Sequence, residues 1–144
     1  MSDPAPVGRV LCGLSLIKTM EPASFAEIGL LKDAYMAFNS RDIDSALSAM
    51  HPDVKWANGM EGGYVYGHAE VRSYWTRQWS IIDPHVEPLR FRRDATGRIL
   101  VDVHQVVRDL SGAIMLDQPV QHIYTISDGL VQTMEIRKAT ESSV

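Results

Sequence analysis

The sequence has 144 residues, of which 45% are hydrophobic and 22% are charged, and its formal net charge is −4. This length and composition are typical of one globular domain with its own hydrophobic core. The negative charge argues against a nucleic acid as the main partner, because that class of protein presents a clustered basic face. The single cysteine, Cys12, excludes an internal disulfide framework and a thiolate metal site, so a reducing, cytoplasmic setting is expected.

Residues 1–20 form a candidate extension ahead of the domain, which we place at 21–140. One arginine precedes a short apolar run at residues 10–17. This run lies at the lower limit for the apolar part of a signal peptide, and no clear cleavage site follows it. It is also much shorter than the roughly 20 residues that cross a membrane as a helix. We therefore expect neither export nor membrane insertion.

Three helices are expected in the first half of the domain. Apolar residues recur at three- and four-residue spacing over residues 22–39, which is the pattern of an amphipathic helix. Asp42 is a candidate N-cap for a second, shorter helix that Pro52 would end. A third helix is expected at 68–82, where large apolar and aromatic residues fall on one stripe, and Asp83 with the proline after it would end it.

The other expected elements are strands. One is predicted at 54–58, and four more follow the last helix, at 86–94, 98–108, 113–126 and 130–138. Turn signals separate these four strands, and the strongest is Ser-Asp-Gly at 127–129. Consecutive hairpins imply an antiparallel sheet with helices available to cover one face, so the fold class is α+β.

Alternation along the two central strands predicts which residues face the core. If residues 110 and 111 form a two-residue turn, Ile99 pairs with His122. One face of the two strands is then mostly apolar and carries three polar residues: Gln105, His122 and Tyr124. His104 falls on the wetter outer face opposite Asp117.

This pairing also argues against a metal site. His104 and His122 would lie five residues out of register, roughly 17 Å apart at about 3.4 Å per residue. Zinc ligands lie about 2.1 Å from the ion, so the two histidines cannot share one.

The last hairpin allows two registers. A three-residue turn at 127–129 pairs His122 with Met134, whereas a two-residue turn pairs it with Glu135. The first register is favoured, because it turns Met134 inward and keeps the glutamate in water. The second would create a His122–Glu135 pair suited to acid–base chemistry.

Three stretches carry a resemblance to a known group of proteins. They are AFNSRDIDSALSAMHPDVKW, YGHAEVRSYW and IYTISDGLVQTMEIR, and the likeness extends over residues 25–138. The chain resembles the nuclear transport factor 2-like superfamily, and most closely its SnoaL-like and ketosteroid isomerase-like group. The resemblance implies a cone-shaped α+β fold, in which a curved mixed or antiparallel sheet wraps around the N-terminal helices and encloses a pocket. It also implies a homodimer formed through the sheet.

The resemblance places several residues at positions of the steroid isomerase site. Asn58, which either caps a turn or lines the pocket, stands where those enzymes have a catalytic carboxylate, and a carboxamide cannot accept the proton. Ala34 stands where they have a tyrosine, while Tyr35 projects about 100° away around the helix. His122 stands where they have a protonated aspartic acid, and it can donate a hydrogen bond or act as a base. A core histidine satisfied by a neighbour is an equal alternative for His122, and steroid isomerisation is not expected.

We expect the pocket to take a small, apolar or aromatic, oxygenated molecule. The candidate catalytic residues are His122, Asn58 and Tyr124. The candidate substrate-binding residues are Trp56, Tyr35, Trp75, Trp79, Gln105 and Met134, although these aromatic residues also suit a plain core. The resemblance implies isomerase, cyclase, dehydratase or epoxide hydrolase chemistry without a metal or an organic cofactor. The alternative is a non-catalytic ligand-binding or dimerisation module, which the lack of a carboxylate at position 58 favours.

Overall fold

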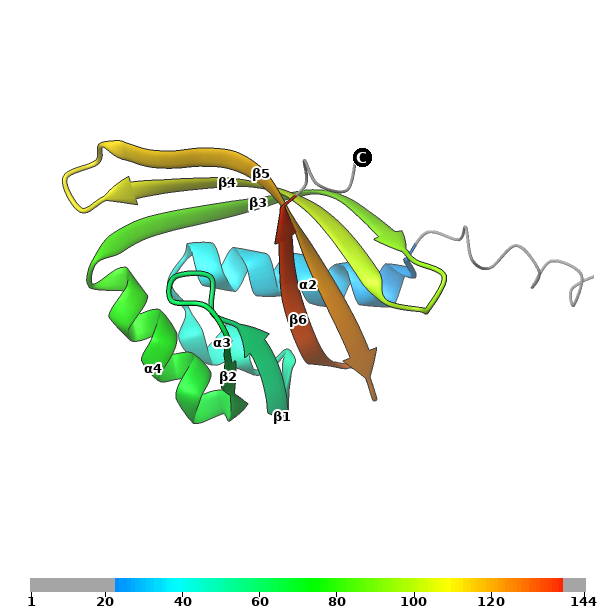
Figure 1. The fold of residues 1–144 in the computed structure, drawn as a ribbon. Helices are drawn as coiled ribbons and strands as arrows, with labels where there is room; N and C mark the ends of the chain where they lie inside the picture. Colours follow the sequence, from blue (N-terminus) through cyan, green and yellow to red (C-terminus); the bar gives the residue numbers. More distant parts are fainter. Residues whose placement is uncertain (1–22, 139–144) are drawn as a thin grey trace, which may run out of the picture.

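The computed structural model describes residues 23–138, and the candidate extension at 1–20 lies outside the described residues (Figure 1). The helices are α2 (Phe25–Asn39), α3 (Ile43–Leu47) and α4 (Gly67–Trp79). The strands are β1 (Met50–Ala57), β2 (Tyr64–Tyr66), β3 (Ile82–Arg93), β4 (Ile99–Asp109), β5 (Ile114–Ser127) and β6 (Leu130–Lys138). None of the helices in this part of the chain is long and apolar enough to cross a membrane.

The first two helices begin at capping residues that the sequence marks clearly. Ser24 and Glu27 form a capping box at the start of α2, which satisfies backbone N–H groups that the helix itself leaves free. Asp42 caps α3 by accepting from the backbone N–H of Ser45, as predicted.

Both prolines expected to end helices lie in strands instead. Pro52 lies inside β1, in the segment where the pairing with β6 shifts register. Pro84 lies in β3, opposite Val107 of β4, and α4 has already ended at Trp79. β3 is an edge strand, and an edge tolerates a residue that has no N–H to donate.

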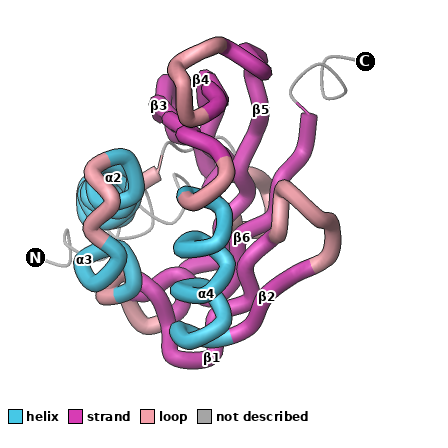
Figure 2. Tube along the Cα trace, turned by 90° about the vertical axis from the view of Figure 1, so that its left-hand side faces the viewer, coloured by secondary structure: helices cyan, strands magenta, loops and turns pink. Residues whose placement is uncertain are grey.

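The six strands form one sheet in the order β2-β1-β6-β5-β4-β3. β1 runs parallel to β6, and every other pair is antiparallel, so the sheet is mixed. The sheet curves over α2 without closing, as Figure 1 shows, and Figure 2 shows α2 nearly end-on with α4 running crosswise to it. This is the α+β cone that the resemblance implies.

The register of β4 and β5 differs from the predicted one by two residues. Ile99 pairs with Tyr124, and His122 pairs with Val101. The turn after Asp109 is longer than two residues, and the pairing shifts again between Val107 and the next residue. A shift of two residues keeps the side chains of residues 99–107 and 116–124 on their predicted faces.

The outer face of these strands also agrees with the prediction. His104 pairs with Pro119 on the neighbouring strand and lies three residues from the level of His122. Its Nε2 is 2.7 Å from the Asp117 carboxylate on the exposed side of the sheet.

The register of β5 and β6 matches neither predicted hairpin. The turn has two residues, Asp128 and Gly129, both with positive φ, as in the tight turns that suit a twisted hairpin. Gln132 is then an extra residue in β6, because Ile126 pairs with Val131 and Thr125 pairs with Thr133.

This bulge decides which side chains of β6 face inward. His122 pairs with Ile136, and Tyr124 pairs with Met134. Glu135 pairs with Ile123 on the other face, so the predicted His122–Glu135 pair does not form. Met134 is buried in the core, as expected.

Candidate functional site

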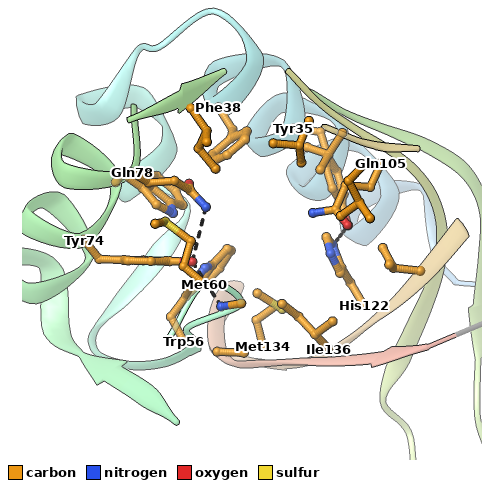
Figure 3. A pocket seen from close by; sticks show the side chains of 18 of the residues that line it. Tyr35, Phe38, Trp56, Met60, Tyr74, Gln78, Gln105, His122, Met134 and Ile136 are labelled. Carbon is orange, nitrogen blue, oxygen red and sulfur yellow. Dashed lines mark hydrogen bonds between the residues drawn. The ribbon is translucent and has the colours of Figure 1, made fainter. Parts of the chain in front are cut away.

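A cavity of about 490 Å³ lies between α2, α4 and the inner face of the sheet. This volume suits a small organic ligand. Its walls are mainly aromatic and aliphatic, with a few polar side chains pointing inward (Figure 3). All the predicted site residues except Asn58 and Trp79 line this cavity.

Trp79 lies behind the cavity wall. Its ring stacks on Trp75, with centroids 5.8 Å apart, and meets Phe38 edge to face. The guanidinium of Arg41 lies over the Trp79 ring, 4.9 Å from its centre. Trp79 therefore supports the wall rather than forming its surface.

Asn58 holds together the loop that follows β1. Its Oδ1 accepts from the backbone N–H groups of Met60 and Glu61, at 3.0 and 2.8 Å, and its Nδ2 donates to the Glu61 carboxylate at 2.9 Å. Glu61 in turn pairs with Arg77 of α4. This geometry is that of a turn cap, and the loop it stabilises carries Gly59 and Met60 into the cavity wall.

His122, Tyr35 and Tyr124 form a hydrogen-bonded chain at one end of the cavity. The Tyr124 hydroxyl donates to the Tyr35 oxygen at 2.9 Å, and the Tyr35 oxygen is 2.7 Å from Nδ1 of His122. With the Tyr124 hydroxyl donating to its oxygen, Tyr35 has its own O–H to donate as a hydrogen bond to Nδ1. In this arrangement the proton of a neutral His122 ring is on Nε2.

Burial keeps all three of these groups uncharged. It lowers the pKa of His122 to about 4, so the imidazole is neutral at pH 7. It raises the pKa of Tyr35 well above 10, and the pKa of Tyr124 is raised by the same cause. Nε2 has no hydrogen-bond partner within residues 23–138, so its N–H can donate to an oxygen atom of a ligand.

Tyr74 and Gln78 of α4 also line the cavity, and neither is among the predicted site residues. The signal was present, because both fall on the apolar stripe predicted for this helix and they lie one turn apart. A polar residue on such a stripe points toward whatever the stripe covers, which here is the cavity.

Charge is scarce along the described lining. Lys138, at the end of β6, is the one lysine or arginine of this lining, and no aspartate or glutamate belongs to it. Within the described ranges, no group of three or more His, Cys, Asp or Glu side chains is placed to hold a metal ion.

Comparison with known proteins agrees with this architecture. The sequence profile of the SnoaL-like domain matches residues 31–134. The chain belongs to the SnoaL-like domain family. Its fold is accordingly the nuclear transport factor 2-like, ketosteroid isomerase-like fold. A search of curated proteins found no match.

Three solved structures show how far the likeness of this SnoaL-like chain extends. TerC, co-crystallised with polyporic acid, is 28% identical with a TM-score of 0.70, over 82% of this chain and 95% of that one. A protein of unknown function from Burkholderia pseudomallei is 25% identical with a TM-score of 0.70, over 83% and 95%. RV0760c from Mycobacterium tuberculosis, in complex with an estradiol hemisuccinate, is 12% identical with a TM-score of 0.65, over 77% and 92%, which shows the fold alone.

Proposed function

We propose that this protein binds a small, mostly apolar molecule bearing a carbonyl-type oxygen and promotes proton-transfer chemistry on it. The reaction class is that of an isomerase, cyclase or dehydratase. The observation that carries this proposal is the buried, neutral His122, whose Nε2–H is held toward the cavity by the hydroxyl of Tyr35. TerC, which was crystallised with polyporic acid, supports a small-molecule ligand.

His122 acts in this proposal as a hydrogen-bond donor rather than as a general base. Its Nδ1 already accepts a hydrogen bond from the Tyr35 hydroxyl, and its lowered pKa makes it a weak base. When solvent water takes a proton from the carbon next to a carbonyl, negative charge develops on the carbonyl oxygen. A fixed N–H in a cavity of low polarity stabilises that charge strongly, and loss of one such donor typically lowers kcat about 10²–10³-fold.

The aromatic walls hold the rest of the ligand. Trp56 meets Trp75 edge to face at 5.5 Å and Tyr124 at 6.3 Å, and all three line the cavity. Met134 and Gln105 complete the wall around His122. Such a surface takes a flat or cyclic apolar skeleton.

A non-catalytic binding protein is the second candidate. No carboxylate lines the described part of the cavity, so the chain offers no strong proton acceptor beside the ligand. A binding function needs only the donor and the apolar walls. The two candidates differ in one measurable property, which is the rate of proton exchange on a bound ketone.

The experiment uses the ketone in which a phenyl ring is attached to cyclohexanone opposite its carbonyl, together with phenylcyclohexane as the hydrocarbon control. Calorimetry measures binding, and proton NMR in D₂O measures exchange of the hydrogens next to the carbonyl. We expect the protein to bind the ketone more tightly than the hydrocarbon and to accelerate the exchange. His122→Phe should abolish both effects, because it keeps a ring but removes the donor.

Binding of the ketone without accelerated exchange would establish the second candidate instead. Equal binding of ketone and hydrocarbon by the unmodified protein would contradict the role of His122 in both candidate functions.

We also propose, from the family resemblance, a cytoplasmic homodimer formed through the outer face of the sheet. Light scattering after size-exclusion chromatography tests the dimer, which a monomeric mass would overturn.

A further inference from the structure

The end of the cavity opposite His122 has polar groups of its own. Tyr74 and Gln78 project there from neighbouring turns of α4, while His122 and Tyr35 lie across the cavity (Figure 3). Between the two ends the labelled side chains are mainly apolar, Trp56 and Met134 among them. The cavity therefore has two separate polar ends joined by an apolar middle.

The hydroxyl of Tyr74 has a proton to donate and no described acceptor for it. Its oxygen accepts from the backbone N–H of Gly59 at 3.0 Å and from Nε2 of Gln78 at 3.3 Å. These two donors occupy both acceptor positions of the oxygen. Burial raises the pKa of Tyr74, so the hydroxyl keeps its proton at neutral pH.

The carboxamide of Gln78 has a hydrogen-bond acceptor without a described donor. Its Oε1 is buried and has no hydrogen-bond partner within residues 23–138. A buried acceptor without a partner is costly, and native proteins rarely keep one without a reason. Because Gln78 bonds to Tyr74, the open acceptor and the open donor belong to adjacent groups.

A hydroxyl is the chemical group that satisfies both at once. It can accept from the Tyr74 O–H with its oxygen and donate its own proton to Oε1 of Gln78. A ketone could only accept the hydrogen bond from Tyr74, and an ammonium group could only donate to Gln78.

We propose that Tyr74 and Gln78 form a recognition site for a hydroxyl group on the ligand. This inference rests on the proposed function, since the same molecule would place its carbonyl-type oxygen at His122. The ligand class is thus an elongated, largely apolar molecule with a carbonyl oxygen at one end and a phenol or alcohol at the other.

The test adds one hydroxyl to the ketone used above. The first probe carries a para-hydroxyphenyl ring on cyclohexanone opposite the carbonyl, the second carries the unsubstituted phenyl ring, and the third carries a para-methoxyphenyl ring. We expect the unmodified protein to bind the hydroxylated ketone about 10-fold more tightly than the unsubstituted one, as two buried hydrogen bonds allow. The methoxy probe can accept but not donate, so it should not gain this preference.

Gln78→Met is the decisive variant, because methionine matches glutamine in length and helix propensity but lacks the amide. It should bring the hydroxyl preference close to 1-fold, because the affinity for the hydroxylated ketone should fall much more than the affinity for the unsubstituted one. Its melting temperature should stay level or rise, since an unsatisfied buried acceptor has been removed. Gln118→Met is the matched control, since Gln118 also lines the cavity but its amide already donates to Gln105.

Tyr74→Phe is the second variant and should also remove the preference, although it leaves the Gly59 N–H without its acceptor. Equal binding of the hydroxylated and unsubstituted ketones by the unmodified protein would overturn the hydroxyl site and leave the proposed function standing. A preference that survives in Gln78→Met would overturn it as well. Failure of both ketones to bind would overturn the proposed function and this inference together.

Discussion

The hydroxyl of Tyr35 lies 2.7 Å from Nδ1 of His122, although 87 residues separate the two in the sequence. Their rings are parallel within 5°, with centroids 5.7 Å apart. This contact joins α2 to β5 at one end of the cavity, and with Tyr35 as the donor it leaves the ring proton of the histidine on Nε2. The chemistry available to a ligand at His122 therefore depends on Tyr35.

Tyr35→Phe tests this dependence. Without the hydroxyl, Nδ1 of His122 has no donor and the Tyr124 hydroxyl has no acceptor, so we expect a loss of about 1–3 kcal/mol in the free energy of unfolding. ¹⁵N NMR of the imidazole should show the Nε2–H tautomer alone in the unmodified protein and a mixture in the variant. Affinity for the ketone should fall several-fold.

The double variant Tyr35→Phe/Tyr124→Phe separates stability from tautomer control. It removes the stranded Tyr124 hydroxyl as well, so part of the lost stability should return. The tautomer mixture should persist, because Nδ1 still lacks a donor. A single tautomer in both variants would show that Tyr35 does not position the ring.

The lowered pKa of His122 predicts how stability changes with pH. Its value is about 4 in the folded protein, against an ordinary value of 6.5 for the unfolded chain. Between these values the unfolded chain binds more protons, so the free energy of unfolding decreases as the pH falls from 6.5 toward 4 and is constant above that range. At pH 5 this group alone should cost about 2 kcal/mol relative to pH 7.5.

His122→Gln provides the control for this pH dependence. The groups that face the imidazole are the hydroxyls of Tyr35 and Tyr124, whose raised pKa values keep them neutral throughout. Urea unfolding of both proteins at pH 7.5, 6 and 5 gives the difference that belongs to His122, because the other histidines are common to both. Parallel curves for the two proteins would mean that the buried ring takes up a proton without penalty.

Much of the cavity could be predicted from alternation alone, and the reason lies in Val101 and His122. Alternation predicts both on one face of the sheet but pairs His122 with Ile99, two residues away from its actual partner Val101. Successive side chains alternate between the two faces of a strand, so a register error of two residues leaves each side chain on its predicted face. The predicted partners across the strands were wrong. The bulge at Gln132 has no signature in the hydrophobic pattern, and this is why both predicted hairpin registers were wrong.

Asn58 and Tyr35 show where a pattern stops being informative. Alternation from Trp56 points Asn58 inward only if the strand continues, and β1 ends at Ala57. Tyr35 follows the fully buried Leu31 by one helical turn, so the helix itself aims it at the core. Registration on the steroid isomerases places Ala34 at the position of their tyrosine, Tyr35 is itself one of the predicted substrate-binding residues, and both line the cavity.

Asn58→Ala should act mainly on stability. The change removes the acceptor of two backbone N–H groups and the donor to Glu61, and we expect a loss of about 1–3 kcal/mol in the free energy of unfolding. Ketone affinity should fall less than in His122→Phe, because the effect reaches the cavity only through the loop with Gly59 and Met60. Chemical denaturation and calorimetry give the two quantities.

Asn58→Asp is the informative companion, since it keeps the oxygen acceptor but sets a carboxylate beside that of Glu61. If Asn58→Ala were as stable as the unmodified protein but no longer accelerated proton exchange on the ketone, Asn58 would have a catalytic role and not only a structural one.

Met134→Ala should change the size of ligand that the cavity accepts. Met134 is 2% exposed, pairs with Tyr124 across the hairpin and lines the cavity, so its truncation enlarges space next to His122. Large-to-small core changes of this type cost about 2–5 kcal/mol, and we expect the lower end because one side of the methionine already faces open volume.

Val131→Ala is the control, since Val131 is 1% exposed in the same strand but is not part of the lining. Only Met134→Ala should bind a ketone with a methyl group added beside the carbonyl more tightly than the parent ketone. If Val131→Ala gained the same preference, the change would reflect general loosening of the core rather than the shape of the cavity.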